Sequence, residues 1–379
     1  MSETTQTLPL LILALDFGGS ATKGIYYTFE KRNPASLIVE PEVIKIPLES
    51  VASDSTEILG ATSPENIAWV NINGETFAVG YLAQQKYYAN AGLKELKYER
   101  AIAKTASAVW VASQKLKLGC NFQLALACLL PPGELENKQS LEEQLGTALA
   151  NYITATGRMQ VKLIEFKCLP EGAGIYLAYQ KRVGEALKRK VIALAMVGYR
   201  NASVLIGDRG VVAADGKTSD LGMIRLLERV VAKTSGQTPS LLAPAIVAAG
   251  SDLSPVPLLR LLRSTGNANK QQELQQIQKA VKLARSEYSA ALTSWLNQVI
   301  PRQVDEILFC GGTADYMKKE LNLHYRGKSC VWGVGANIPK QVDEFSLLSR
   351  LADVYSLFLY FSQAVEKRFQ SVGTRGGNH

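Results

Sequence analysis

The chain has 379 residues, of which 47% are hydrophobic and 20% are charged, the balance of a globular protein long enough for two domains rather than of a disordered chain. Its net charge of +8 comes from 42 basic and 34 acidic residues spread along the sequence, a pattern typical of solvated faces that shows no nucleic-acid or acidic-lipid site by itself.

The cysteines and histidines argue against two further classes of protein. The five cysteines form no CxxC pair and only two histidines are present, which excludes a histidine-rich metal centre and favours free thiols in a reducing compartment. The polar start and the short apolar run 10–15 do not form a signal peptide, and no run approaches the roughly 18 apolar residues of a membrane span. We therefore expect a cytoplasmic protein without a transmembrane segment.

The first half alternates strand and helix patterns. Asn73-Gly74 is a strong two-residue hairpin signal, because both residues tolerate positive φ. Ser140 and Glu143 have the spacing of a capping box at a helix start. The predicted elements are a strand, a Gly-rich turn and a second strand over 10–29, a β-rich segment over 37–46, a hairpin over 68–79, a helix over 94–114, a strand over 124–130 that stops at PPG, a helix from 140, a strand over 161–169 and a helix over 171–179.

The second half repeats this plan. Strands are expected over 191–197 and 203–206, helices over 221–233 and 271–298, and a short strand over 307–310. The long helix carries apolar residues at spacings of three and four, so one face is predicted to be buried. Surface loops are expected over 251–257 and 264–270. Two halves with the same order of elements indicate an internal structural duplication.

The segment 16–23 (DFGGSATK) is the first candidate for chemistry. A strand that ends at Asp16 puts a carboxylate at the carboxyl edge of a sheet, where α/β proteins bind ligands. Gly18 and Gly19 let backbone N–H groups approach phosphate oxygens, and Lys23 on the returning strand supplies a positive charge. Asp16 would hold Mg²⁺ through water. The alternative is an ordinary Gly-Gly hairpin with a capping aspartate.

A second candidate lies near the end of the chain. The apolar strand 307–310 runs into Gly311-Gly312-Thr313 and a helix start, a platform of bare backbone on which a nucleoside can rest. This pattern is weak alone, since many strand-to-helix turns contain Gly-Gly. It gains value because the same chain opens with the segment 16–23.

Together these motifs, in this order, resemble the actin-like ATPases, and among them the plasmid-segregation actins of the ParM/StbA type. The resemblance extends along nearly the whole chain through VNINGETFAVGYLA, LLPPG, LPEGAGIY, TSDLGM and LARSEYSAALTSWL. It implies that Asp16, Gly18, Gly19, Ser20 and Lys23 form the first phosphate loop. It also implies that Gly311, Gly312 and Thr313 form the adenosine motif.

The resemblance further places Glu171 of LPEGAGIY where the family orients the attacking water, a role that suits a carboxylate at a helix start. The alternative is a glutamate that complements the helix dipole. Lys282 and Arg285 are expected to lie on the long helix, off its apolar face. The resemblance implies that they border base and ribose, and the alternative is that they face solvent.

The second phosphate loop departs from the family, which has a strand ending in aspartate followed by glycines and threonine. Here the aligned stretch has Met196 in the aspartate's place, followed by Gly198, Tyr199, Arg200 and Asn201. Arg200 brings a cation that could neutralise phosphate directly, or it pairs with a surface acid. The departure puts the metal geometry and the hydrolysis rate in doubt more than nucleotide binding.

The expected fold is therefore α/β, an actin/Hsp70-like (ribonuclease H-like) duplicated fold with nucleotide in the interdomain cleft. Domain I is expected to span 1–169, with helix 345–372 packing back on it, and domain II 170–344. The resemblance implies a filament-forming ATPase or GTPase that uses ATP or GTP with Mg²⁺ and assembles with itself. It would segregate plasmid DNA through a small DNA-binding adaptor protein, without reading DNA sequence directly, or serve a derived cytoskeletal role.

Two rival functions remain open. A sugar-kinase-type phosphotransferase shares the fold and first loop, but it needs a catalytic aspartate near a sugar pocket that cannot be identified here. A non-hydrolysing actin-like assembly or scaffold protein would keep nucleotide as a structural part, and the missing second-loop aspartate favours it.

Overall fold

The computed structural model describes residues 8–52, 62–212, 216–335 and 337–373, and divides into two compact units. Unit 1 is Met1–Lys181 with Gly335–His379, and unit 2 is Arg182–Val334. The boundary expected at residues 169 and 170 falls at the end of a strand of unit 1. The first unit instead continues through most of the next helix, because that helix packs against the returning C-terminal helix.

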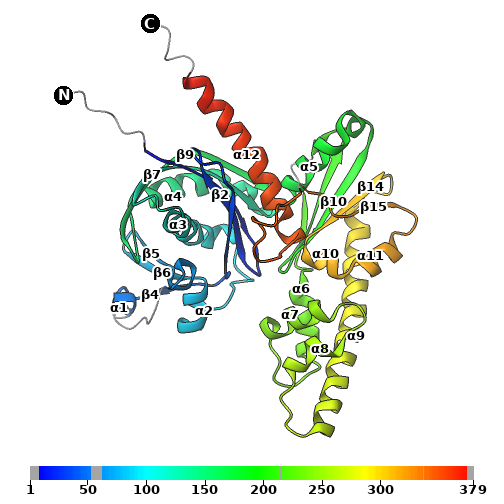
Figure 1. The fold of residues 1–379 in the computed structure, drawn as a ribbon. Coiled ribbons are helices and arrows are strands. Elements are labelled where there is room, and N and C mark those ends of the chain that lie inside the picture. The colour runs from blue at the N-terminus through cyan, green and yellow to red at the C-terminus, as the bar shows by residue number, and fades with distance from the viewer. Residues whose placement is uncertain (1–7, 53–61, 213–215, 336, 374–379) are drawn as a thin grey trace, which may run out of the picture. The chain divides into compact units, whose positions relative to one another are not determined.

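Unit 1 contains one sheet and the helices around it (Figure 1). Its strands are β1 (Leu10–Phe17), β2 (Thr22–Thr28), β3 (Ala35–Val39), β4 (Val43–Ile46), β5 (Trp69–Ile72), β6 (Glu75–Val79), β7 (Asn121–Leu130), β8 (Tyr152–Thr154) and β9 (Gly157–Pro170). Its helices are α1 (Glu49–Ala52), η2 (Pro64–Ile67), α2 (Tyr81–Tyr87), α3 (Lys97–Leu116), η3 (Pro132–Asn137), α4 (Lys138–Ala150), α5 (Ala173–Val183) and α12 (Ser349–Gly373).

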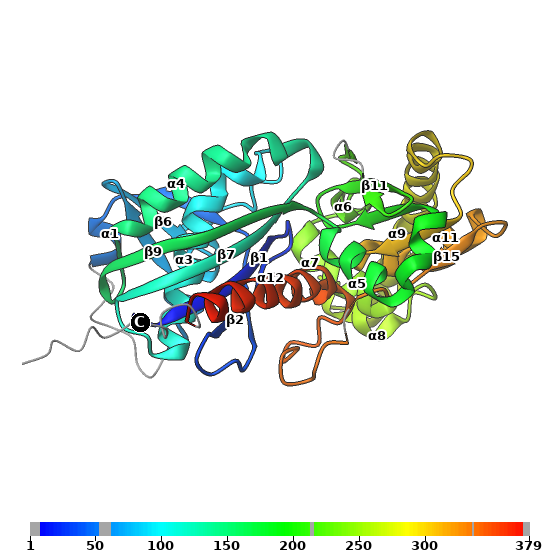
Figure 2. The same cartoon turned by 90° about the horizontal axis from the view of Figure 1, so that it is seen from above.

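The strands of this sheet follow the order β3-β2-β1-β7-β9-β8-β5-β6-β4. The central strands β1, β7 and β9 run parallel, so their carboxyl ends share one edge. Alternate residues of β1 face opposite sides: Leu11, Leu13 and Leu15 join the core under α3, and Ile12 and Ala14 join the core under α12. Figure 2 shows α12 and α4 on opposite sides of β7 and β9.

Unit 2 repeats the central motif on a smaller scale. Its elements are η4 (Gly184–Arg189), β10 (Val191–Val197), β11 (Ala202–Asp208), β12 (Val211–Val212), β13 (Lys217–Ser219), α6 (Met223–Val231), α7 (Pro239–Ala249), α8 (Pro255–Leu258), η5 (Leu259–Leu261), α9 (Asn267–Val299), β14 (Glu306–Cys310), α10 (Gly312–Tyr316), α11 (Lys318–His324) and β15 (Ser329–Val331). As β1 pairs antiparallel with β2 and parallel with β7, β10 pairs antiparallel with β11 and parallel with β14. The expected duplication is therefore present in the topology.

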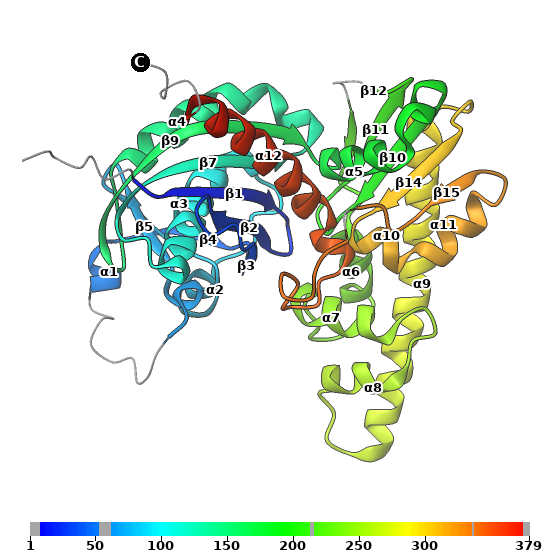
Figure 3. The ribbon, with the colours of Figure 1, turned by 45° about the horizontal axis from the view of Figure 1, so that its top comes forward.

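The long helix of unit 2 buries the face that its sequence pattern predicted. Ile277, Val281, Ala284, Tyr288 and Leu292 of α9 lie in the core of the unit, so the helical periodicity is confirmed. Figure 3 shows α7 and α8 gathered beside α9 at the end of unit 2 away from its strands.

Local predictions succeeded where one turn decides the geometry and failed where neighbours do. The hairpin at Asn73-Gly74 is confirmed, with φ of 52° and 84°. The capping box at Ser140 is wrong, because η3 leads directly into α4 and places Ser140 inside that helix. The surface loop expected over 251–257 is also wrong in part, since α8 begins at Pro255, a residue suited to a first helical turn.

Candidate functional site

The carboxyl end of β1 carries a buried ion pair. Asp16 lies opposite Lys23 in the β1–β2 ladder, and the Lys23 ammonium contacts the Asp16 carboxylate. Both side chains are nearly buried, with exposed fractions of 5% and 10% for Asp16 and Lys23. Lys23 Nζ also donates to the carbonyl oxygen of Arg350, 2.9 Å away on α12. The predicted loop residues are thus brought together and fastened to the C-terminal helix.

The turn between β1 and β2 presents open backbone donors. In the described part of the chain, no hydrogen-bond acceptor is recorded for the N–H groups of Gly18, Gly19 and Ser20. A Cβ at Gly18 would lie 2.6 Å from the carbonyl oxygen of Ala21, so the tight turn requires glycine there. Successive unpaired N–H groups at the edge of a sheet form a concavity suited to an anion.

Arg350 completes this corner from α12. Its Nη2 donates to Ser20 Oγ at 3.0 Å, so the predicted binding residue Ser20 is already fixed by a cation. Burial lowers the pKa of the Arg350 guanidinium, while the negative charge of Asp16 opposes that shift. The corner therefore holds two cations, Lys23 and Arg350, beside one carboxylate.

Glu171 lies in the turn after β9, at the same sheet edge. Its N–H donates to the carbonyl oxygen of Leu130 at the end of β7, at 2.8 Å, and its side chain is buried. The turn needs glycine next, since Gly172 has φ of 92°. Glu171 therefore lies two residues before the start of helix α5, close to the predicted helix start.

Asp353 on α12 holds this turn in place. Its carboxylate accepts the N–H of Gly172 at 2.6 Å and the N–H of Ile175 at 3.2 Å, which caps α5 from another helix. The two helices meet at Gly174, where a Cβ would lie 2.0 Å from the carbonyl oxygen of Asp353. Burial raises the pKa of Asp353 to about 7; the charges of Asp16 and Glu171 add to the rise, and the two N–H donors oppose it.

A lysine at the start of α3 pairs with Glu171. The Lys97 ammonium contacts Glu171 Oε1, and both side chains are nearly buried, with exposed fractions of 7% and 6% for Lys97 and Glu171. A second buried lysine, Lys104, follows two turns later on α3. Burial lowers the pKa of Lys104 to about 8, Lys97 and Arg100 add to that shift, and Glu42 and Asp16 oppose it.

These groups fit a phosphate chain. The edge formed by β1, β7 and β9 combines unpaired amides with buried cations, and a charged ligand held there is screened little by solvent. The same groups fit Mg²⁺. The Asp16 carboxylate would accept hydrogen bonds from water bound to the metal and would keep its contact with the Lys23 ammonium. Within the described residues, no three Asp, Glu, His or Cys side chains gather as a metal-binding group.

The corresponding corner of unit 2 is closed. Met196 pairs with Ser203 and lies beside Cys310, the place on β10 that Asp16 has on β1. The Gly198 N–H donates to the carbonyl oxygen of Asn201 at 2.9 Å, so this predicted phosphate donor is already used. The carbonyl oxygens of Gly198 and Tyr199 accept the N–H groups of Met223 and Ile224, which caps the start of α6.

The Gly-Gly turn of unit 2 packs against that loop. Gly311 has φ of 94°, and a Cβ there would lie 2.5 Å from the carbonyl oxygen of Val197. The hydroxyl of Thr313 donates to the carbonyl oxygen of Gly198 at 2.8 Å. The structure thus brings Gly311, Gly312 and Thr313 together with Gly198 and Asn201, and the Thr313 hydroxyl serves this contact.

Lys282 and Arg285 line a groove of 650 Å³ between α9, α11 and residues 251–253. Lys282 is exposed, whereas Arg285 is 6% exposed, so the expectation that Arg285 lies off the buried face is wrong. Its guanidinium pairs with Glu320 at 2.7 Å, donates to the Tyr316 carbonyl oxygen at 2.9 Å and lies over the Tyr316 ring. The helices after Gly312 cover Arg285, which the periodicity of α9 alone does not show.

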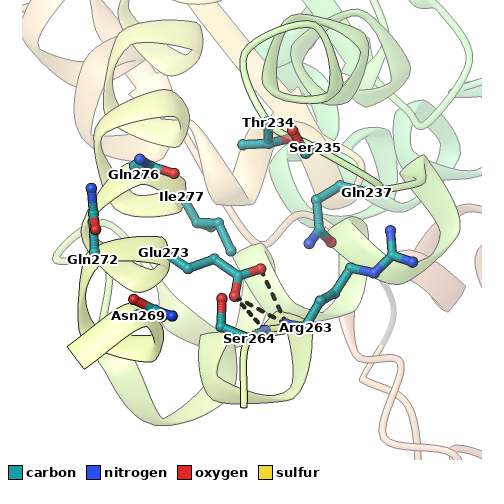
Figure 4. A pocket seen from close by; sticks show the side chains of 10 residues that line it. All are labelled: Thr234, Ser235, Gln237, Arg263, Ser264, Asn269, Gln272, Glu273, Gln276 and Ile277. Atoms are coloured by element: carbon teal, nitrogen blue, oxygen red, sulfur yellow. Dashed lines mark hydrogen bonds between the residues drawn. The ribbon is translucent and has the colours of Figure 1, made fainter. Parts of the chain in front are cut away.

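A second cavity of 520 Å³ lies at the start of α9, away from every predicted site residue (Figure 4). Its walls are mainly hydroxyl and amide side chains. Glu273 reaches across it and accepts the N–H groups of Arg263 and Ser264, both at 3.1 Å or less. These contacts hold the loop before α9 against the first turns of that helix. We therefore interpret the cavity as part of the packing between loop and helix and not as a ligand site.

Three residues near the first loop escaped sequence reasoning: Lys97, Arg350 and Asp353. Arg350 and Asp353 lie three apart at the start of α12, whose sequence RLADVYSLFLYF is otherwise mainly apolar. Charged residues in so apolar a helix are a signal of a buried contact. Lys97 gives no such signal, since it lies among other charged residues in KELKYER.

No protein-family model matches the sequence, and no curated protein matches it. Solved structures do match in fold. The actin-like protein Alp7A superimposes with a TM-score of 0.67 at 14% identity, covering 97% of this chain and 100% of that one. The chain has the actin-like fold. It is similar also to a 15-stranded ParM filament from Clostridium botulinum, with a TM-score of 0.60 at 14% identity, covering 94% of this chain and 100% of that one.

A ParM from Bacillus thuringiensis, solved with ATP, has a TM-score of 0.58 at 12% identity, covering 93% of this chain and 98% of that one. The expected relation in fold to plasmid-segregation actins of the ParM type is thus confirmed. Identities this low carry the fold and not the chemistry. Among the described residues, none of the helices combines the length and apolarity that a bilayer crossing requires.

Proposed function

We propose that this actin-like chain binds and hydrolyses a nucleoside triphosphate and assembles with itself into filaments. The observation that carries the proposal is the corner at residues 16–23, where open amides of Gly18, Gly19 and Ser20 lie beside the Asp16–Lys23 pair. Anions bind at such edges because backbone donors and cations replace their hydration. ATP or GTP with Mg²⁺ is the ligand class that this corner suits.

The site residues of unit 1 have distinct roles in the proposed reaction. The amides of the first loop and Lys23 bind phosphate oxygens, and Asp16 orients water of the metal shell. Glu171 accepts a proton from the attacking water, since it lies buried at the same sheet edge. Arg350 and Asp353 hold Ser20 and the Glu171 turn in position. The nucleotide, when bound with its metal, supplies the phosphoryl group that is transferred to water.

In unit 2 we propose that Gly311, Gly312 and Thr313 support the nucleoside. Lys282 and Arg285 would border it from α9. Support comes from the contacts that join this turn to the second loop and from the buried position of Arg285 beside Tyr316. Arg285 would act mainly by holding α10, because its Nη2 donates to the Tyr316 carbonyl oxygen and to Glu320.

The filament and its cellular role are proposed on the fold. One similar structure is described as a 15-stranded ParM filament and another as an Alp12 filament. We propose that this chain likewise polymerises and that the filament moves DNA through an adaptor protein, or serves a cytoskeletal role derived from it. A cytoplasmic location follows from that role.

A second candidate has its own observation. The contact between Lys97 and Glu171 occupies one oxygen of the proposed base, and the second loop has Met196 where an aspartate would hold the metal. Both features suit a scaffold that assembles with nucleotide bound but does not hydrolyse it.

Light scattering with and without ATP or GTP, followed together with phosphate release, separates these functions. We expect scattering to rise with triphosphate and phosphate to follow with a delay. A scaffold would scatter without phosphate release, and a sugar kinase would neither scatter nor release phosphate without its acceptor. Electron micrographs with a slowly hydrolysed triphosphate give the direct control; an absence of filaments under every condition would contradict assembly.

A further inference from the structure

The start of α3 is fastened to the sheet edge that carries the first loop. The Tyr98 N–H donates to Glu134 in the segment after β7, at 3.1 Å, and the Lys97 ammonium contacts Glu171 after β9. Two chain segments that follow parallel strands therefore fix one helix start. This places the Lys97 ammonium at the carboxyl edge of β7 and β9, next in the sheet to the end of β1.

The Lys97–Glu171 pair is too deeply buried to be an ordinary surface ion pair. Such a pair adds little stability over an apolar pair of the same volume, because both charges lose their hydration. One further lysine, Lys104, is buried two turns along the same helix. A desolvated ammonium of this kind can exchange part of its carboxylate contact for the oxygens of a phosphate, which also offer charge-assisted hydrogen bonds.

We propose that Lys97 reads the terminal phosphate of the bound nucleotide. With a diphosphate bound, its ammonium stays on Glu171. With a triphosphate bound, the ammonium donates to the terminal phosphate as well, and Glu171 gives up part of that contact. Lys97 thereby distinguishes triphosphate from diphosphate and frees the carboxylate only when the terminal phosphate is present. This inference rests on the proposed nucleotide-binding function.

The test uses equilibrium binding to the full chain, below the concentration of assembly, with ADP and a slowly hydrolysed ATP analogue. Glu171→Gln keeps the Lys97 ammonium and removes the negative charge of Glu171, which pairs with Lys97 and would repel the terminal phosphate. We expect this variant to bind the ATP analogue more tightly than the wild type does, with little change for ADP. The ratio of the two dissociation constants is the measured quantity.

The double variant Lys97→Met with Glu171→Gln removes both charges and leaves no charge of the pair unpartnered. Relative to Glu171→Gln alone, we expect it to lose about ten- to a hundredfold of its preference for the ATP analogue, the range of one charge-assisted hydrogen bond. Lys97→Arg with Glu171→Gln should keep most of that preference. Thermal melts check folding, and Lys97→Gln with Glu171→Gln replaces the methionine variant if it melts early.

The matched control is the pair at the other end of α3, where Lys115 contacts Glu65. Lys115→Met with Glu65→Gln should leave the ratio unchanged. Equal ratios for Glu171→Gln and its Lys97→Met double variant would overturn the role of Lys97 while nucleotide binding itself stands. A wild-type chain that binds neither ADP nor the ATP analogue would instead overturn the proposed function, and this inference with it.

Discussion

Two strand–turn–strand corners occupy the same place in their sheets and differ in what their turns can bind. The first corner, residues 16–23, joins β1 to β2; the second, residues 196–203, joins β10 to β11. At the first, the glycine amides are open and a buried carboxylate meets a lysine. At the second, the Gly198 amide is bonded within the turn, and methionine replaces the carboxylate.

This difference shows that two turns at the same place in a repeated topology need not leave the same backbone groups open. Two carbonyl oxygens of the second turn accept N–H groups at the start of α6. Helix and turn also approach closely, since a Cβ on Gly222 would lie 2.3 Å from the carbonyl carbon of Arg200. Gly222, at the start of α6, therefore allows that helix to pack closely against the turn. Both turns return at once to a strand, β2 after the first and β11 after the second, but among the described residues only the second is bonded through its backbone to the start of a helix, α6. The donors of the first turn remain available for a ligand.

The largest expected effect lies on the side of the first corner. Glu171→Gln should slow phosphate release by about two to four orders of magnitude, the range for loss of a general base. The control is Glu306→Gln, at the start of β14 in unit 2, where Glu306 pairs with Lys190. It should leave the rate nearly unchanged. Unchanged turnover in the Glu171 variant would leave its carboxylate as a partner for Lys97 alone and would favour the scaffold function.

Asp16→Ala should next reduce stability and binding together. It leaves the Lys23 ammonium buried without its carboxylate, and loss of one partner of a buried pair costs about 3–5 kcal/mol of unfolding free energy. Met196→Leu, at the matching place in β10, should cost less than about 1.5 kcal/mol, since it conserves volume.

Denaturant unfolding measures both changes, and nucleotide titration follows binding. The double variant Asp16→Ala with Lys23→Met should recover most of the stability without recovering Mg²⁺-dependent nucleotide binding. Full recovery of binding by the double variant would show that the pair is structural only.

A smaller difference in stability is expected between alanine substitutions at Gly18 and Gly198, the first glycine of each turn. Gly18→Ala places a Cβ 2.6 Å from a backbone oxygen, and such overpacking typically costs about 1–3 kcal/mol. Gly198→Ala meets only the Asn201 carbonyl oxygen at 3.5 Å, an ordinary contact, so its cost should stay within about 0.5 kcal/mol. Thermal melts of both variants test the contrast. Equal melting points would mean that the first turn relaxes as easily as the second.

The sequence was informative where function depends on local order. Segment 16–23 forms the strand, turn and strand that its pattern predicted, and Met196 lies where the aligned aspartate was expected. The fold followed from the order of motifs, although no single one was decisive. The roles of the site residues stay predictions, because they depend on a ligand.

What the sequence could not provide are contacts between distant segments. Asp353 caps a helix that starts 180 residues earlier in the chain, and Lys97 meets Glu171 through the packing of α3 on the sheet. Arg285 sits at the edge of the apolar face of α9, and its burial depends on α10 and α11. Likewise, whether a glycine amide is open depends on the conformation of its turn, as the bond from the Gly198 N–H to Asn201 shows, and composition does not reveal that conformation.

The last prediction tests whether the second corner takes part in binding through a side chain instead of its backbone. If Arg200 contacts phosphate, Arg200→Ala should weaken triphosphate by about ten- to a hundredfold, as for one charge-assisted contact. Diphosphate should weaken less, because it lacks the terminal charge that a guanidinium would meet. Arg200→Lys, which keeps the charge but not the planar fork, should fall between. Equal losses for both nucleotides would assign Arg200 to packing beside Gly222, and the first corner would then carry the phosphate contacts without it.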